Sequence, residues 1–447
     1  MIIDNWSLKG GYIVGSYKIH PSKLKGKVKI PPSKSMAHRA VICAALSNGL
    51  SRLTNIDYSD DIIATINAMK SLGAIINKKD DYLEVIGIKS PDNKCKDIDS
   101  ERIIDCNESG STLRFLVPIA AIFDGVNRFI GRGNLGKRPL DTYYNIFDEQ
   151  GIKYNYREGI LDLVTEGKLK AGEFKVKGNI SSQFITGLLF TLPLLDGDSK
   201  IIITTEMESK GYIDLTLSAM KDFGIEIINN DYREFIVKGN QTYVSRDYRV
   251  EGDYSQAAFF LCADALSNEV IAEDLKLDSL QGDKEVIDIL GRMGVKITPK
   301  DNGFLGKAPE NLKSTIIDGS QCPDIIPVVS LVACLCEGTC EVINAGRLRI
   351  KECDRLAAVT SELNKLGAKI TEKEDGLTIE GVKKLKGGVE VWSHKDHRIA
   401  MTLAIASTVC DEPIIIKDYE CVSKSYPMFW DDFKCLGGNL NEWNVGK

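Results

Sequence analysis

The feature of this chain that most restricts its fold is a pattern that occurs six times along its 447 residues. In each copy, an amphipathic helical pattern ends at a glycine and a β-branched or alternating segment follows. The glycines are Gly73, Gly151, Gly224, Gly294, Gly367 and Gly437, separated by 78, 73, 70, 73 and 70 residues. Because glycine suits the left-handed position that ends a helix, each copy predicts a helix followed by strands.

A second series of six helical segments runs in step with the first and is apolar nearly all round. These segments end at Gly49, Gly125, Gly197, Asn268, Gly338 and Asp411. A helix without a polar face must be buried on all sides. The sequence therefore predicts six units of about 73 residues, each of βαβαββ type with one buried and one amphipathic helix.

Six such units are too large for one hydrophobic core and fit two domains of three units each. We expect an α/β fold of two similar domains, with an active site in the cleft between them. The first domain is predicted to span residues 33–244. The second is predicted to span residues 245–447, with residues 1–32 completing it.

Composition excludes several classes of protein. A formal net charge of −6 argues against general nucleic-acid binding, and the longest apolar stretches fall short of a membrane span. The first residues show no basic segment leading into an apolar one, so we expect a cytoplasmic protein. Twelve cysteines without a CxxC pair, and only four histidines, argue against a disulfide scaffold and a structural zinc site.

Polar or basic residues stand just before the buried helices, at the same place in every unit. The segments are residues 32–39, 108–114, 181–183, 253–256, 322–324 and 394–398. Any one of them alone is more often a helix cap than a binding site. Six in register, with Lys34, Arg39, Arg114 and Arg398 among them in an acidic chain, favour an anion-binding cleft at the helix N-termini.

Two further basic clusters, residues 131–138 and 347–355, follow predicted strands. The first resembles a phosphate loop, but Arg138 stands where Ser or Thr is needed, and Pro139 follows it. In the second, Lys351, Glu352 and Arg355 would share one turn of a helix, although a solvated charge run is the simpler alternative. Asp324 opens an apolar helix, which is costly unless its carboxylate is paired or acts as a base.

Seven motifs connect the chain to a known family. PSKSMAHR, ESGSTLR, GNLGKRPL, SSQF, PDIIP, RIKECDR and KDHRIAM, in this order and spacing, resemble the 5-enolpyruvylshikimate-3-phosphate synthases over nearly the whole chain. The resemblance implies two inside-out α/β barrel domains, each of three βαβαββ units. It also implies transfer of the enolpyruvyl group of phosphoenolpyruvate to the 5-hydroxyl of shikimate 3-phosphate, by a monomer without metal or organic cofactor.

The same resemblance implies the residues that hold each substrate. For shikimate 3-phosphate they are Lys34, Ser35, Arg39, Ser181, Ser182, Gln183, Ser209, Asp324 and Lys351. For phosphoenolpyruvate they are Lys34, Gly110, Arg138, Gln183, Arg355, Arg398 and Lys424. Arginine suits this role because its planar fork binds a carboxylate or phosphate through two hydrogen bonds.

Catalysis is expected from three of these or neighbouring residues. Glu352 is the candidate acid for the methylene carbon of phosphoenolpyruvate, Asp324 the candidate base for the 5-hydroxyl, and Lys34 bridges the substrates. Glu108 and Arg347 depart from the family pattern and are left out of the predicted site. A side chain at Gly110 would intrude on the phosphoenolpyruvate pocket, which glyphosate occupies in the family, so sensitivity to glyphosate is a hypothesis.

Two alternatives remain at this stage. A UDP-N-acetylglucosamine enolpyruvyl transferase shares the fold and donor, but it typically has Lys-Asn-Ala near the first helix and a reactive loop cysteine. This chain has Lys34-Ser35-Met36 and no cysteine in residues 131–140. A non-catalytic or RNA-processing repeat protein is the other alternative, and salt-dependent RNA affinity would favour it.

Overall fold

The computed structural model describes residues 15–89 and 101–443, and within them the strands form six four-stranded sheets. In the second unit, for example, the strand order is β6-β7-β9-β8. β6 and β7 are parallel, while β9 is antiparallel to both β7 and β8. The same order recurs in all six sheets, which confirms the predicted βαβαββ unit and the α/β fold class.

The first half of the molecule contains three units. The first comprises β14 (Tyr248–Arg249), α1 (Lys34–Leu46), β3 (Leu50–Thr54), α2 (Asp60–Ser71), β4 (Ile75–Lys78) and β5 (Tyr82–Ile86). The second comprises β6 (Glu101–Asp105), α3 (Gly110–Ala120), β7 (Val126–Ile130), α4 (Asp141–Gln150), β8 (Lys153–Tyr156) and β9 (Asp162–Glu166). The third comprises β10 (Glu173–Val176), α5 (Ser182–Thr191), β11 (Ser199–Ile203), α6 (Lys210–Asp222), β12 (Ile227–Asn230) and β13 (Glu234–Val237).

The second half repeats this plan. Its first unit comprises β2 (Lys25–Lys29), α7 (Tyr254–Ala265), β15 (Glu269–Glu273), α8 (Val286–Arg292), β16 (Lys296–Lys300) and β17 (Gly303–Lys307). The next comprises β18 (Ile316–Asp318), α9 (Ile326–Ala333), β19 (Thr339–Ile343), α10 (Arg355–Lys365), β20 (Lys369–Lys373) and β21 (Gly376–Glu380). The last comprises β22 (Glu390–Trp392), α11 (His397–Ala406), β23 (Ile414–Lys417), α12 (Phe429–Cys435), β24 (Asn439–Glu442) and β1 (Ser16–His20).

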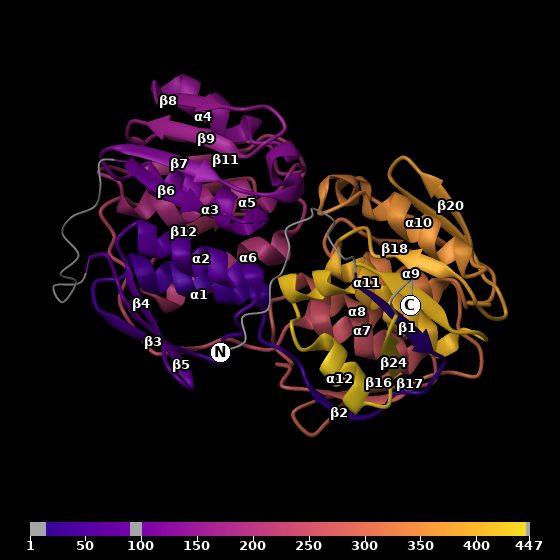
Figure 1. Ribbon diagram of the computed structural model, residues 1–447. Helices are drawn as coiled ribbons and strands as arrows, with labels where there is room; N and C mark the ends of the chain where they lie inside the picture. The colour runs from indigo at the N-terminus through magenta and orange to yellow at the C-terminus, as the bar shows by residue number, and fades with distance from the viewer. Residues whose placement is uncertain (1–14, 90–100, 444–447) are drawn as a thin grey trace, which may run out of the picture.

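The two halves exchange strands at their junction, as Figure 1 shows by the indigo β1 and β2 lying among the elements of the C-terminal half. β1 pairs with β23 and β24, and β2 pairs in parallel with β15. Conversely, β14 pairs in parallel with β3, so residues 248–249 extend a sheet of the first half, although the sequence predicts them in the second domain. We propose that the domain boundary lies after residue 250. Residues 1–14, 90–100 and 444–447 lie outside the part of the chain that the structure describes.

The glycines predicted to end helices do so. Gly73, Gly151, Gly224, Gly294, Gly367 and Gly437 have φ angles of 101°, 70°, 82°, 94°, 101° and 103° and follow α2, α4, α6, α8, α10 and α12. These are left-handed conformations that a side chain disfavours. Local chemistry therefore sets where each amphipathic helix stops.

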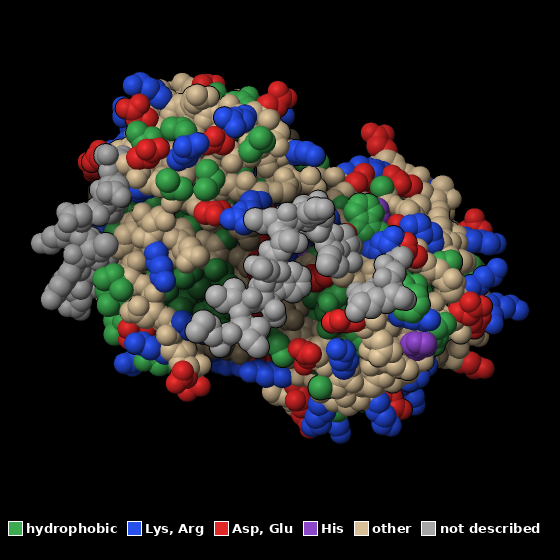
Figure 2. Space-filling model, viewed as in Figure 1, with side chains coloured by type: hydrophobic (Ala, Val, Ile, Leu, Met, Phe, Trp, Pro, Cys, Tyr) green, Lys and Arg blue, Asp and Glu red, His purple; other side chains and the backbone are tan. Residues whose placement is uncertain are grey.

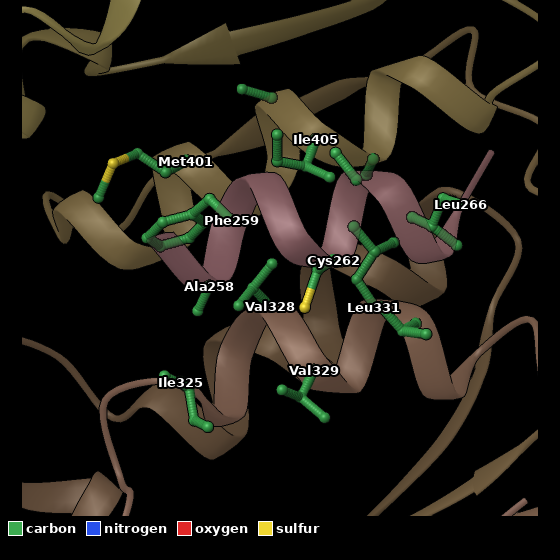
Figure 3. Close-up of a cluster of buried hydrophobic side chains, with 14 of the residues drawn as sticks. Ala258, Phe259, Cys262, Leu266, Ile325, Val328, Val329, Leu331, Met401 and Ile405 are labelled. Atoms are coloured by element: carbon green, nitrogen blue, oxygen red, sulfur yellow. The ribbon is translucent and has the colours of Figure 1, made fainter. Parts of the chain in front are cut away.

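The helices predicted to be buried form the interior of each half. Every residue of α7 is buried, and Figure 3 shows its Phe259 and Cys262 packed among side chains of α9 and α11. The buried apolar residues form two clusters, one within residues 36–250 and one within residues 17–30 and 254–440. No helix in the described ranges is long and apolar enough to span a membrane.

Candidate functional site

A pocket lies where the two halves meet, and both halves line it. Its walls from the first half are Lys34, Ser35, Arg39, Asp61, Gly110, Ser111, Arg114, Phe115, Arg138, Ile180, Ser181, Ser182, Gln183, Ser209 and Tyr212. Its walls from the second half are Asp324, Arg347, Ile350, Lys351, Glu352, Arg355 and His397. The structure therefore brings together most of the residues that the sequence predicts for the site.

The pocket is built at helix N-termini, as the positions of the polar segments predict. Lys34, Gly110 and Ser182 are the first residues of α1, α3 and α5, and Arg355 and His397 begin α10 and α11. The preceding residue of each of these helices is a Ser or Asp whose side chain accepts a backbone N–H of the first turn. In four of these five helices the cap and the predicted binding residues are different members of one segment, whereas Ser181 of α5 is both.

The lysine and arginine of the first motif are held by residues of both halves. Lys34 Nζ lies 3.0 Å from a carboxylate oxygen of Asp61, and the Lys34 backbone N–H donates to Asp253 of the other half over 3.0 Å. Arg39 is buried and donates to Thr216 Oγ1 and to the carbonyls of Ser35 and Tyr212. Burial lowers the pKa of Arg39 to about 10, so it remains a cation at neutral pH.

Gly110 allows a close approach to Arg138. A Cβ atom at Gly110 would lie 2.6 Å from Arg138 Nη1 and 3.6 Å from Gln183 Oε1. Gln183 is itself oriented, because it accepts from Arg114 Nη1 over 2.8 Å and donates to Ser111 Oγ over 3.0 Å. Any side chain at Gly110 would therefore displace the guanidinium of Arg138.

Arg355 is the centre of a buried charge network in the second half. It is 1% exposed and contacts three carboxylates: Asp324 over 2.9 Å, Glu352 over 2.8 Å and Asp396 over 2.8 Å. Asp324 also lies 3.3 Å from Arg398 and 3.7 Å from Lys351. Burial raises the pKa of Asp324, but Arg398, Lys351 and Arg355 outweigh it, and the net pKa is well below the ordinary value.

Glu352 has a similar electrostatic environment. Burial raises the pKa of its carboxyl, while Arg138 at 3.4 Å, Arg355 and Lys424 together hold the net pKa well below the ordinary value. The prediction that Lys351, Glu352 and Arg355 share a helical turn is wrong, because α10 begins only at Arg355. A short 3₁₀ helix, η4 (Gly346–Ile350), and a bend bring the three side chains together instead.

Two predicted binding residues lie beside the pocket rather than in its wall. Arg398 is 3% exposed and lies behind the pocket wall. Its guanidinium donates to the carboxylate of Asp324 and to Ser255. Lys424 lines a neighbouring cavity, where its Nζ lies 3.2 Å from the carbonyl of Glu108 and 3.4 Å from its carboxylate. Glu108, one of the two departures from the family pattern, is thus an ion-pair partner of Lys424.

Several pocket residues are absent from the sequence prediction. Arg347 forms an ion pair with Glu208 of the other half and donates to Ser209 Oγ over 3.0 Å. Tyr212 and His397 also line the pocket, and among the described residues both ring nitrogens of His397 lack a hydrogen-bond partner. Arg347 and His397 carried a signal, since they belong to a basic cluster and to the 394–398 segment, but Tyr212 is recognisable only from the fold.

Metal binding and disulfide formation are not indicated among the described residues. These residues contain no group of three or more His, Cys, Asp or Glu side chains placed to hold a metal ion. Their cysteines are free thiols, most of them buried. On the side in view in Figure 2, basic and acidic side chains are interspersed over the outer surfaces of both halves. This mixture does not resemble the basic face of a nucleic-acid-binding protein.

Comparison with known proteins gives one consistent result. The family model described as EPSP synthase (3-phosphoshikimate 1-carboxyvinyltransferase) matches residues 19–433. A 3-phosphoshikimate 1-carboxyvinyltransferase of Clostridium beijerinckii is 80% identical over 97% of this chain and all of the relative. One of Clostridioides difficile is 69% identical over 97% of this chain and all of the relative.

Solved structures agree on the fold. An EPSP synthase of Acinetobacter baumannii superposes with a TM-score of 0.80 and 24% identity, covering 96% of this chain and all of that one. The enolpyruvyl transferase NikO of Streptomyces tendae superposes with a TM-score of 0.78 and 14% identity, covering 97% of this chain and all of that one. At these identities the likeness concerns the fold alone.

Proposed function

This chain belongs to the EPSP synthase family, and we propose that the pocket between its two halves is where it carries out the family's reaction. The activity is transfer of the enolpyruvyl group of phosphoenolpyruvate to the 5-hydroxyl of shikimate 3-phosphate, with release of phosphate. Relatives at 64–80% identity share this activity, so the UDP-N-acetylglucosamine alternative is not favoured.

The observation that supports the proposed site most strongly is the convergence of cations on two carboxylates. Lys34 and Arg138 come from the first half, while Asp324, Glu352 and Arg355 come from the second. Both substrates are anions, so such a cluster suits them. Further parts of the proposed site are Ser35, Arg39, Ser181, Ser182, Gln183, Ser209 and Lys351 for shikimate 3-phosphate, and Gly110, Gln183, Arg398 and Lys424 for phosphoenolpyruvate.

The reaction needs a proton at the methylene carbon of phosphoenolpyruvate while the 5-hydroxyl attacks C2. We assign the first transfer to Glu352 and the second to Asp324, each of which faces the pocket. The resulting tetrahedral intermediate then expels phosphate while its new methyl group returns a proton to the Glu352 carboxylate, which restores the enolpyruvyl double bond. Lys34 is placed to stabilise the charge that develops between the two substrates. The protein is expected to work as a monomer, since both halves of the site come from one chain.

The function is tested by phosphate release from phosphoenolpyruvate with a single acceptor present. Release with shikimate 3-phosphate and none with UDP-N-acetylglucosamine is the expected result. Release only with the sugar nucleotide would overturn the assignment. No release with either acceptor would also overturn it, and the Glu108 ion pair with Lys424 would then be examined first.

Glu352 is expected to take up a proton when phosphoenolpyruvate binds. In the free protein Arg138 and Arg355 hold its pKa well below the ordinary value, so it is ionised and cannot act as an acid. An anionic ligand that neutralises these arginines raises the pKa, and a rising pKa means proton uptake. Calorimetric titration of phosphoenolpyruvate alone, in buffers of different ionisation enthalpy, measures this uptake. It should disappear in Glu352→Gln, and equal uptake by both proteins would contradict the prediction.

Replacing Gly110 with alanine is expected to raise the KM for phosphoenolpyruvate by about 10- to 100-fold. This range corresponds to the loss of one hydrogen bond to a charged group. The added methyl group displaces the guanidinium of Arg138, which lies 2.6 Å from the new Cβ position. Steady-state kinetics measure the effect. Gly291→Ala is the control, since a Cβ there meets no atom within 4 Å. An unchanged KM in Gly110→Ala would remove Arg138 from the proposed site.

A further inference from the structure

Asp283 is a buried carboxylate that the proposed reaction does not use. It lies in the 3₁₀ helix η3 (Gly282–Glu285) of the second half and is 4% exposed. Its Oδ2 lies 3.1 Å from the hydroxyl oxygen of Tyr212, while its Oδ1 has no hydrogen-bond partner among the described residues. A buried carboxylate with so few donors requires an explanation.

The Tyr212 hydroxyl lies between two carboxylates, 3.1 Å from Asp283 Oδ2 and 3.0 Å from Asp324 Oδ2. It has one hydrogen and can donate to only one of them. The other contact is a hydrogen bond only if that carboxyl is itself protonated. Asp324 is held ionised by three cations, so the protonated partner at lower pH is Asp283.

A close backbone contact between the two halves creates this arrangement. Tyr212 belongs to α6 of the first half, and Gly211 precedes it. A Cβ at Gly211 would lie 2.8 Å from Gly282 N and 2.9 Å from Gly282 Cα. Only glycine at this position allows η3 to come so close to the start of α6. The hydroxyl can therefore reach both carboxylates of the other half.

We propose that Asp283 is a positioning residue that acts through Tyr212 to set the basicity of Asp324, an inference that rests on the proposed function. At low pH, Asp283 donates its proton to the Tyr212 oxygen, and Tyr212 donates its hydrogen to Asp324. Ionised Asp283 has lost its proton to solvent and accepts the Tyr212 hydrogen instead. Asp324 then lacks one hydrogen-bond donor, so it becomes a stronger base for the 5-hydroxyl.

The charged surroundings place this change near neutral pH. Burial and the negative charges of Asp324 and Asp253 raise the pKa of Asp283, Arg398 and the hydrogen bond from Tyr212 oppose them, and the net pKa is about 7. The titratable and charged groups that face Asp283 are Tyr212 from α6, Asp253 before α7, Cys322 and Asp324 before α9, and Arg398 from α11. Catalysis by Asp324 is therefore expected to increase as the pH rises through about 7.

The test is the pH dependence of kcat with both substrates saturating. In the wild-type protein kcat should rise through the pH at which Asp283 ionises. In Asp283→Asn the amide donates to Tyr212 permanently and keeps the tyrosine hydrogen on Asp324. This rise should then be lost, with kcat at pH 8 lower by up to about tenfold for each pKa unit of basicity that Asp324 loses. The KM for shikimate 3-phosphate should stay within about threefold.

Two further variants make the result specific. Tyr212→Phe should also remove the rise, and adding Asp283→Asn to it should change the profile no further, because Asp283 acts through the hydroxyl. Asp264→Asn is the matched control. Asp264 is a buried carboxylate at the far end of α7 with a pKa raised by burial to about 8, and it accepts the N–H groups of Val270 and Gly306. The Asp264→Asn variant should keep the rise of kcat with pH, even where it is less stable than the wild type.

The outcomes separate this inference from the function itself. A wild-type protein without phosphate release on shikimate 3-phosphate would overturn the proposed function. An active wild type whose rise is unchanged in Asp283→Asn would overturn the role of Asp283 alone. If Asp283→Asn does not fold, the Tyr212→Phe variant tests the inference instead. A rise of kcat with pH that is unchanged in Tyr212→Phe would overturn the role of Asp283.

Discussion

Replacing Glu352 with glutamine is expected to lower kcat by about 10²- to 10⁴-fold, the range typical of a lost general acid. Glutamine keeps the size of the side chain and a carbonyl oxygen that can accept from Arg355. It cannot deliver a proton to the methylene carbon of phosphoenolpyruvate. Because binding is expected to survive, the KM values should change much less than kcat.

Glu362→Gln is the control for this variant. Glu362 is likewise a buried carboxylate of the second half, ion-paired with Lys365 and contacting His394, but it lies outside the pocket wall. The Glu362→Gln variant should be less stable than the wild type but should keep the wild-type kcat. Single-turnover measurement of phosphate release compares the chemical step in the two variants. A Glu352→Gln protein with wild-type turnover would assign the acid to another group, and His397 would be the first to examine.

Replacing Arg355 with alanine is expected to destabilise the protein by about 3–5 kcal/mol, the cost of breaking a buried ion pair from one side. The change leaves the buried Asp396 and the partly buried Asp324 and Glu352 without their shared cation. For domains of this size, that corresponds to a decrease in Tm of about 6–20 °C. Turnover of the folded fraction should also fall, since the positions of both proposed proton-transfer groups depend on Arg355.

Thermal unfolding followed by calorimetry measures this effect. Arg349→Ala is the control, because Arg349 pairs with Asp354 and Glu372 near the surface, where an ion pair contributes about 0–1 kcal/mol. The Arg355→Lys variant tests whether the network needs only a positive charge or also the planar shape of the guanidinium. It restores a cation but cannot contact three carboxylates through a planar fork. An Arg355→Ala protein with the wild-type Tm would show that the network contributes no net stability.

Local patterns predicted most of the secondary structure. The six terminating glycines and the six apolar helices are recognisable from neighbouring residues, because left-handed caps and periodic burial are properties of one segment. The motifs that carry substrate-binding residues are also local. Ser181, Ser182 and Gln183, for example, adjoin one another at the start of α5 and lie together in the pocket wall.

Other features of the site depend on contacts between distant segments. Lys351 and Glu352 were expected on a helix, yet they stand in the bend before α10, and Arg398 supports Asp324 from behind the wall. Arg347 was left out of the predicted site, and its ion pair with Glu208 joins the two halves. No property of the segment around Arg347 indicates which carboxylate of the other half it meets.

Local sequence patterns establish the number of units, the order of helices and strands within them and the residue types available to bind anions. These follow from propensity, capping and periodicity, which act over a few residues. The folded chain is needed to see that β14 joins the first sheet and β1 the last, and that Tyr212 bridges Asp283 and Asp324, 71 and 112 residues away. Such pairings depend on packing between remote segments, where close contacts such as that of Gly211 with Gly282 select one arrangement.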